Sequence, residues 1–269
     1  MKKTLLLVVV AVALLFPKTS SAEALPKRVW KFGPEIYHFS YREASVGVED
    51  KGVMFGLAGS YTRHINRAMM RLEMRGAFGE VDYTSESTGS VDNISDYTLE
   101  PRILLGYDFI DEESHWYTVY TGFGYRYLND GGGGSISTTG ALGYDRESNY
   151  FYFPLGIEGT AIITEDWNIS AFIEFDILIA GQQYTHLSTA SSRLTDLTND
   201  QNRGFGFKTA LNFERATEKY DISFGPFFRY WKINVSETAT AISGGTTVLE
   251  LIEPNNQTSE LGLNVSVLY

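Results

Sequence analysis

The feature that most constrains the fold of this chain is a two-residue alternation of apolar and polar side chains over long segments. In residues 167–180 one side is apolar and uncharged, whereas the other side carries Asn168, Ser170, Glu174 and Asp176. A period of two residues indicates a β-strand whose two faces meet different surroundings. Ten segments show this pattern: 35–45, 53–62, 68–80, 97–109, 116–127, 149–161, 167–180, 204–214, 220–233 and 259–269. We therefore predict an all-β protein.

The connections between these segments alternate in length. Short polar links follow the second, fourth, sixth and eighth segments (63–67, 111–114, 163–166 and 215–219), and long ones follow the third, fifth, seventh and ninth (81–95, 128–148, 181–204 and 234–258). A soluble β-sandwich would also alternate, but short turns at one end and long loops at the other favour a transmembrane barrel. We predict a ten-stranded antiparallel up-and-down barrel. Eight strands remain the alternative if the first hairpin, around 46–51, lies outside the wall.

Aromatic residues near the predicted strand ends would form girdles at the two membrane interfaces. The candidates are Tyr97, Trp116, Tyr117, Tyr127, Tyr150, Trp167 and Trp231.

The last segment ends the chain on an aromatic ring. Leu261 shares one face with the four residues that follow it at intervals of two, which are Leu263, Val265, Val267 and Tyr269. This ending resembles the C-terminal signature of bacterial outer-membrane β-barrels. The resemblance implies that the barrel-assembly machinery reads Leu263, Val265, Val267 and Tyr269 as an insertion signal.

The first 22 residues have the layout of a secretory signal peptide: two lysines, an apolar run and then small residues. We predict cleavage after Ala22 or Ala24, Sec-type export from a Gram-negative cell, and a barrel domain over 23–269. Removing 1–22 takes away three of the 22 basic residues and none of the 33 acids, so the formal charge moves from −11 to −14. This balance argues against nucleic acid as a partner. The chain has no cysteine, which excludes disulfides and thiolate chemistry.

Charged residues on the inward faces decide whether the lumen conducts. The alternation places these residues inside: Arg42, Arg71, Arg75, Arg102, Arg126, Lys208, Arg229, Glu73, Glu100, Asp108, Glu158, Glu174, Asp176 and Glu260. Ten tilted strands enclose a cylinder of roughly 20 Å, which side chains from opposite walls nearly fill. Balanced charges in so narrow a space predict a network of ion pairs that fills the lumen, and a narrow channel is a third-ranked function.

The five long connections carry most of the excess acid, with a summed formal charge of −9 over 46–51, 81–95, 128–148, 181–204 and 234–258. Solubility at the cell surface accounts for this charge. The alternative is contact with lipopolysaccharide phosphates through bridging divalent cations.

Ten strands with large loops at one end resemble the omptin family of outer-membrane proteases and its adhesin relatives. That resemblance implies an Asp–x–Asp pair after the third strand and an Asp–x–His pair after the seventh. Here the first position offers Asp82 but has Thr84, and the second offers His186 but has Tyr184. Asp82 and His186 are therefore weak catalytic candidates, and losing the acid beside His186 removes the group that would orient it.

We expect a non-enzymatic surface barrel, structural or binding an external partner through its loops. An omptin-like endopeptidase, or a degenerate relative, is the alternative. The partners expected are outer-membrane lipid, lipopolysaccharide and the assembly machinery, and the chain is expected to be a monomer. No cofactor is expected, because "GGGG" (131–134) lacks the strand and helix of a phosphate loop. No metal is expected either, because the four histidines are not at ligand spacing.

Overall fold

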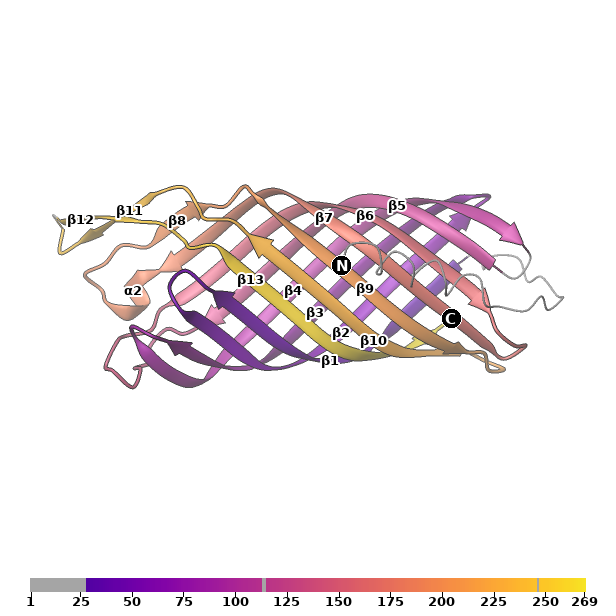
Figure 1. Ribbon diagram of the computed structural model, residues 1–269, viewed down its shortest axis with the longest axis horizontal. Helices are drawn as coiled ribbons and strands as arrows, with labels where there is room; N and C mark the ends of the chain where they lie inside the picture. The colour runs from indigo at the N-terminus through magenta and orange to yellow at the C-terminus, as the bar shows by residue number, and fades with distance from the viewer. Residues whose placement is uncertain (1–27, 113–114, 246) are drawn as a thin grey trace, which may run out of the picture.

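The computed structural model describes residues 28–112, 115–245 and 247–269. The predicted signal peptide, 1–22, lies outside the described residues. Ten long antiparallel strands form a closed barrel (Figure 1). They are β1 (Arg28–Glu43), β2 (Val48–Ile65), β3 (Ala68–Ser85), β4 (Gly89–Glu112), β5 (His115–Gly131), β6 (Asp145–Ile162), β7 (Trp167–His186), β9 (Gly204–Arg215), β10 (Asp221–Ile233) and β13 (Asn256–Leu268). The prediction of a ten-stranded barrel is confirmed, and the eight-stranded alternative is wrong because the first hairpin is part of the wall.

Each wall strand pairs with its neighbours in chain order, and the last strand meets the first. β13 lies between β10 and β1, and the backbones of Trp30 and Tyr269 exchange two hydrogen bonds of 2.9 Å at this seam. The tenth strand is therefore needed to remove both sheet edges, whose backbone groups lipid could not satisfy.

The two ends of the barrel differ (Figure 1). At the turn end, short connections join β2 to β3, β6 to β7 and β9 to β10, and the C-terminus lies there. At the loop end, longer connections carry four further elements: α2 (Leu187–Ala190), β8 (Leu197–Asp200), β11 (Ala239–Ser243) and β12 (Thr247–Leu251). In the described part of the chain, no helix has the length and apolar composition of a membrane span.

The strands extend beyond the predicted segments toward the loop end. Residues 81–95 were predicted to be a loop, but β3 runs to Ser85 and β4 begins at Gly89. Likewise β2 begins at Val48, within the predicted connection 46–51. The apolar alternation stops where the outward face turns polar, at Glu49 and Asp82 for example, whereas backbone pairing continues beyond that point. Periodicity therefore located the apolar part of each strand and missed its polar extension.

A band of exposed apolar side chains encircles the outside of the barrel, and every wall strand contributes to it. One member from each strand, in chain order, is Ile36, Phe55, Leu72, Ile103, Phe123, Leu155, Phe175, Phe205, Phe224 and Leu263. An outward apolar band around a closed barrel is the surface that a bilayer requires. We call the part of the barrel inside this band the membrane segment.

The lumen toward the loop end is filled by side chains. Tyr37, Phe39, Met54, Tyr152 and Trp231 are all at most 2% exposed and point inward. The predicted girdle positions of Tyr150, Trp231 and Trp116 are therefore wrong, since the first two rings lie inside the barrel and Trp116 lines a cavity in the lumen.

Glycines on neighbouring strands make room for some of these rings. A Cβ atom on Gly124 would lie 2.1 Å from the ring of Tyr152, and one on Gly156 would lie 2.2 Å from that of Tyr120. Such close approach is possible only where a side chain is lacking.

Candidate functional site

An ion-pair layer crosses the middle of the lumen. Arg75 lies at its centre: its guanidinium is 2.7 Å from Glu100, 2.7 Å from Glu260 and 3.5 Å from Glu35. Arg229 contacts two of these acids from β10, at 2.7 Å from Glu35 and 3.1 Å from Glu260. Four strands besides β3 are joined through these contacts.

Lys208 forms the second centre of the layer. Its Nζ atom lies 2.6 Å from Glu100, 3.2 Å from Glu174 and 3.1 Å from Asp176, and it also donates to the hydroxyl of Tyr152. All these side chains are nearly inaccessible. An amine surrounded in this way is held in place, because separating it from its partners would leave several buried charges unpaired.

A third group of ion pairs lies closer to the turn end. Arg71 makes two hydrogen bonds of 2.7 and 2.5 Å to the carboxylate of Glu158 on β6, and it lies 3.6 Å from Glu73. Arg102 bonds to Glu73 on the neighbouring strand and, at 2.5 Å, to Glu174 on β7.

The structure thus places the predicted lumen residues Arg71, Glu73, Arg75, Glu100, Arg102, Glu158, Glu174, Asp176, Lys208 and Arg229 inside and pairs them. Arg126 is inside as well, 3.5 Å from Glu260 and stacked over the ring of Trp231.

Arg42 is the exception among the predicted inward charges. Its side chain lies on the outer surface and pairs with Glu49 at 2.7 Å, while its neighbours Tyr41 and Glu43 face inward. Toward the loop end aromatic rings such as that of Tyr41 share the interior with charged groups, and polar side chains also meet water on the outside. A rule that assigns every charge to the lumen fails there.

Sequence reasoning missed several interior charges, including Lys31 and Glu35 near the start of β1. Their position is set by the parity of β1, in which the odd-numbered residues face inward. The predicted strand began only at residue 35, which left Lys31 out. Placing Arg42 inside turned the odd-numbered residues of this strand outward, and Glu35 is one of them.

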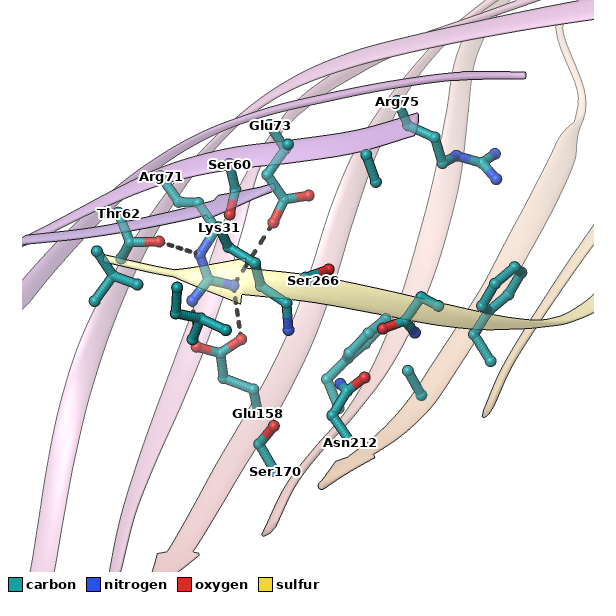
Figure 2. Close-up of a pocket in the computed structure, with 18 of the residues that line it drawn as sticks. Lys31, Ser60, Thr62, Arg71, Glu73, Arg75, Glu158, Ser170, Asn212 and Ser266 are labelled. Atoms are coloured by element: carbon teal, nitrogen blue, oxygen red, sulfur yellow. Dashed lines mark hydrogen bonds and ion pairs between the residues drawn. The ribbon is translucent and has the colours of Figure 1, made fainter. Parts of the chain in front are cut away.

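The lumen contains a cavity of about 310 Å³ between the ion-pair layer and the turn end (Figure 2). Side chains from almost the whole circumference line it, including Lys31, Ser60, Arg71, Glu158 and Asn212. The lining reaches Val29 and Leu268, close to the ends of their strands. Charges of both signs point into the same space, as Figure 2 shows for Lys31, Arg71 and Glu158.

A second cluster, the Arg146 cluster, lies inside the loop end. Four carboxylates surround the guanidinium of Arg146: Asp130 and Glu43 at 2.8 Å, and Asp50 and Glu253 at 3.6 Å. The cluster therefore joins β1, β2, β5 and β6 to the connection that precedes β13. Four acids to one base leave an excess of negative charge in a mostly buried place.

This excess shifts the titration of two of the acids. Asp50 lies between Glu49 and Lys51 on the loop-end side of the membrane segment, and burial raises its pKa to about 7. Burial likewise raises the pKa of Glu253 to about 7, with repulsion from Glu43 adding to the effect. The guanidinium of Arg146 opposes both shifts without cancelling them.

The loop-end connections fold into a cap with a small core of its own. Leu187, Leu197 and Ala241 are buried together. The backbone amide of Thr195 donates to the carbonyl of Ile242, and the amide of Ile242 donates to the hydroxyl of Thr195, so the two connections lie side by side. On the opposite face of the β11–β12 hairpin, Ile242 and Val248 face each other across the strands and are 43% and 61% exposed.

Asp82 lies on the outer side of the wall. It is exposed, and its carboxylate accepts a hydrogen bond of 3.1 Å from the backbone amide of Asn93. The register of β3 and β4 shifts at this point, and Asn93 adopts a φ of 59°. Asp82 thus accepts a hydrogen bond from the backbone amide of Asn93, which the β-bulge leaves without a partner on the neighbouring strand.

His186 ends β7 on a different part of the wall. Its two ring nitrogens lie 3.1 Å from Glu147 and 3.5 Å from Asp196, and its flanking residues Thr185 and Leu187 are the buried ones. The side chains of Asp82 on β3 and His186 on β7 both lie on the outer side of the wall, with β4, β5 and β6 between them, so the structure does not bring them together across the lumen. Within the described ranges, no group of three or more His, Asp or Glu residues is suited to hold a metal ion.

The C-terminal residues form part of the outward band. Leu263 and Val265 are exposed, and Tyr269 is exposed beside the ring of Tyr220 at the turn end. This places the predicted assembly signal on the outer surface of the strand that closes the barrel.

Comparison with known proteins supports the architecture. No protein-family model and no curated protein sequence matches the chain. Among solved structures, the outer membrane protease OmpT from Escherichia coli is similar with a TM-score of 0.57 and 9% sequence identity, over 94% of this chain and 99% of that chain. The translocator domain of autotransporter NalP from Neisseria meningitidis reaches a TM-score of 0.37 at 9% identity, over 98% of this chain and 95% of that one. Neisserial surface protein A reaches 0.34 at 12% identity, over 91% and 99%.

The likeness to OmpT concerns the fold, and it confirms the predicted resemblance in architecture to omptin-like barrels. The chain is an antiparallel barrel of the outer-membrane type.

Proposed function

We propose that this chain is a non-enzymatic surface protein of a Gram-negative outer membrane that binds an external partner through its loop end. The turn end then faces the periplasm. The same proposal includes export, cleavage of the signal peptide after Ala22 or Ala24, and a monomeric state.

The observation that carries the proposal is the folded cap at the loop end. A connection needed only to join two strands has no reason to build a core around Leu187 and Ala241 while exposing Ile242 and Val248 on the other face. Exposed apolar side chains outside the membrane segment are typical of interaction sites. Ile136 and Leu142 form a second exposed apolar pair on the connection between β5 and β6.

Two further observations agree with a binding role. The ion-pair layer and the aromatic side chains above it fill the lumen, which favours a closed barrel over a narrow channel. The separation of Asp82 from His186 gives no support to a catalytic pair of the omptin kind.

The membrane partners are also proposed. The outward band is suited to lipid, and Arg42, Lys51 and Lys232 lie on the outer wall toward the loop end, where lipopolysaccharide phosphates would lie. The exposed residues Leu263, Val265 and Tyr269, with Val267, are offered as the signal that the barrel-assembly machinery reads.

Binding to cells that display the barrel tests the proposal. Fluorescent matrix proteins and a phage collection would be applied to cells expressing the wild type, the Ile242→Asp/Val248→Asp variant and the Thr240→Asp control, which lies on the same face of the hairpin. We expect at least one ligand to bind the wild type and the control but not the double variant.

Binding by none of the three would leave only a structural role. Equal binding by all three would show that Ile242 and Val248 are not the binding surface and would contradict the observation that carries the proposal. Planar bilayers with the refolded protein should stay silent, and a dibasic peptide library should stay uncleaved. Steady conductance, or cleavage that Asp82→Ala or His186→Ala abolishes, would contradict the proposal.

A further inference from the structure

The turn-end cavity has two unlike sides. On one side the charges are already paired: Arg71 donates to Thr62 and to both oxygens of Glu158, and Arg102 binds Glu73 and Glu174. A charged group that is held by two partners has little left to offer a ligand. This side forms a rigid wall.

The other side carries an ammonium group with unused hydrogen-bonding capacity. Lys31 donates one hydrogen bond of 3.0 Å to the hydroxyl of Ser223, and its Nζ atom lies 3.9 Å from Glu214, beyond hydrogen-bond length. An ammonium group has three N–H donors. Within the described ranges two of them have no acceptor at bonding distance, and the side chain points into the cavity (Figure 2).

Acceptors without donors lie on the same side. The amide oxygen of Asn212 is buried, its residue is 7% exposed, and no donor in the described part of the chain reaches it. The amide oxygen of Asn264 is in the same condition, although its nitrogen donates to the carbonyl of Gly225. Buried acceptors of this kind need a partner that the protein does not supply.

We propose that this cavity binds a small zwitterion of the α-amino-acid class. The carboxylate of the ligand accepts from Lys31, and its ammonium group donates to Glu214 and to the amide oxygen of Asn212. An α-amino acid carries its ammonium and carboxylate groups on the same α-carbon. The two groups therefore suit Lys31 and Glu214, an opposite pair of protein charges that lie 3.9 Å apart without a hydrogen bond between them.

The size and position of the cavity limit the ligand further. A volume of about 310 Å³ is at the lower end of small-molecule sites. The ion-pair layer around Arg75 and Glu100 bounds it on the loop side, so the ligand enters from the turn end. This site is independent of the loop-end function, because it lies at the opposite end of the lumen.

Ligand-observed NMR with the full chain refolded in detergent micelles tests the inference. The probes are glycine and L-alanine, with acetate and methylammonium as half-ligands that carry one charge each. We expect saturation transfer to both amino acids, and affinities for the half-ligands that are weaker by about tenfold or more.

Three variants assign the contacts. Lys31→Met and Glu214→Gln should each weaken the binding of L-alanine by about tenfold or more, and Asn212→Leu should weaken it severalfold. Lys232→Met, a change on the outer wall at the far end of the barrel, should leave it unchanged. Glu214→Gln preserves side-chain shape and removes one charge, so it remains informative if Lys31→Met fails to fold.

Several results would overturn the inference. Absence of saturation transfer to both glycine and L-alanine, up to their solubility limits, means that the cavity binds no amino acid. Binding of acetate as tight as that of glycine means a carboxylate site without an ammonium contact. Unchanged affinity in both Glu214→Gln and Asn212→Leu would remove the proposed ammonium site.

Discussion

The Nζ atom of Lys208 on β9 lies 2.6 Å from a carboxylate oxygen of Glu100 on β4, so a single ion pair spans the lumen. Three strands separate β4 from β9 on one side of the wall and five on the other. Glu174 and Asp176 lie within 3.2 Å of the same nitrogen. The lysine therefore neutralises acids from two sectors of the barrel.

Replacing this lysine should be costly. Lys208→Met leaves buried carboxylates without their shared cation, and we expect a loss of about 3–5 kcal/mol in the free energy of unfolding. Urea titration of the protein folded into lipid vesicles measures it. Lys219→Met, in the exposed turn between β9 and β10, should change that free energy by less than about 0.5 kcal/mol. An unchanged urea midpoint for Lys208→Met would show that these acids do not depend on Lys208.

The pair of Arg71 and Glu158 allows a test of coupling. Arg71→Met leaves the Glu158 carboxylate without its ion-pair partner, whereas the double variant Arg71→Met/Glu158→Leu removes both charges. We expect the double variant to be more stable than the single one by about 1 kcal/mol or more, because an unpaired buried charge costs more than the pair contributes. The same titration checks this expectation, and purely additive losses would contradict it.

Glycine contacts in the lumen predict a packing effect. Gly124→Ala introduces a Cβ atom 2.1 Å from the ring of Tyr152, and we expect overpacking to cost about 1–3 kcal/mol in unfolding free energy. Gly76→Ala is the control, because its Cβ atom would have no neighbour closer than 3.6 Å. A Gly124→Ala protein as stable as the Gly76→Ala protein would mean that the ring moves aside freely.

The Arg146 cluster predicts that the loop end weakens at alkaline pH. Asp50 and Glu253 have pKa values raised to about 7 in the folded protein, so the folded state binds more protons than the unfolded state between their ordinary values and about 7. Their contribution to stability is therefore present at low pH and is lost as the pH rises through about 7. Amides in 234–255 should have lower hydrogen-exchange protection factors at about pH 8.5 than at about pH 5.

Two variants isolate the source of this dependence. Asp50→Asn/Glu253→Gln should flatten the change in protection factors with pH, because neither side chain can then ionise. Glu165→Gln, in the exposed turn between β6 and β7, should leave the change as it is in the wild type. Protection that rises with pH in the wild type would reverse the expected sign and refute the assignment.

Much of the wall was predictable because a strand that faces the bilayer alternates apolar and polar residues with a period of two. The ten segments and the outward residues such as Leu72 and Phe175 follow from period-two alternation, and the antiparallel order follows from the alternating lengths of the connections. The interior was less predictable. Arg42 was predicted to face inward and Trp231 to face outward, and both predictions were wrong. Alternation separates the two faces of a strand, but it does not show which face meets lipid, water or aromatic neighbours.

The candidate sites depended on contacts that alternation does not encode. Asp82 and His186 each fitted half of a motif, but both side chains face the outside of the wall on strands that are not neighbours. Conversely, Arg146 carried no motif, and its four acids come from segments up to 107 residues away, with Glu253 the most distant.

By itself, the sequence determined that the chain closes into a barrel, because backbone groups facing lipid have no other way to be satisfied and the apolar faces recur at the length of a bilayer crossing. Only the tertiary structure decided what the barrel contains. Which charges meet, where rings press against glycines and where the 310 Å³ cavity remains depend on the stagger of the strands, which brings distant residues to the same height in the lumen.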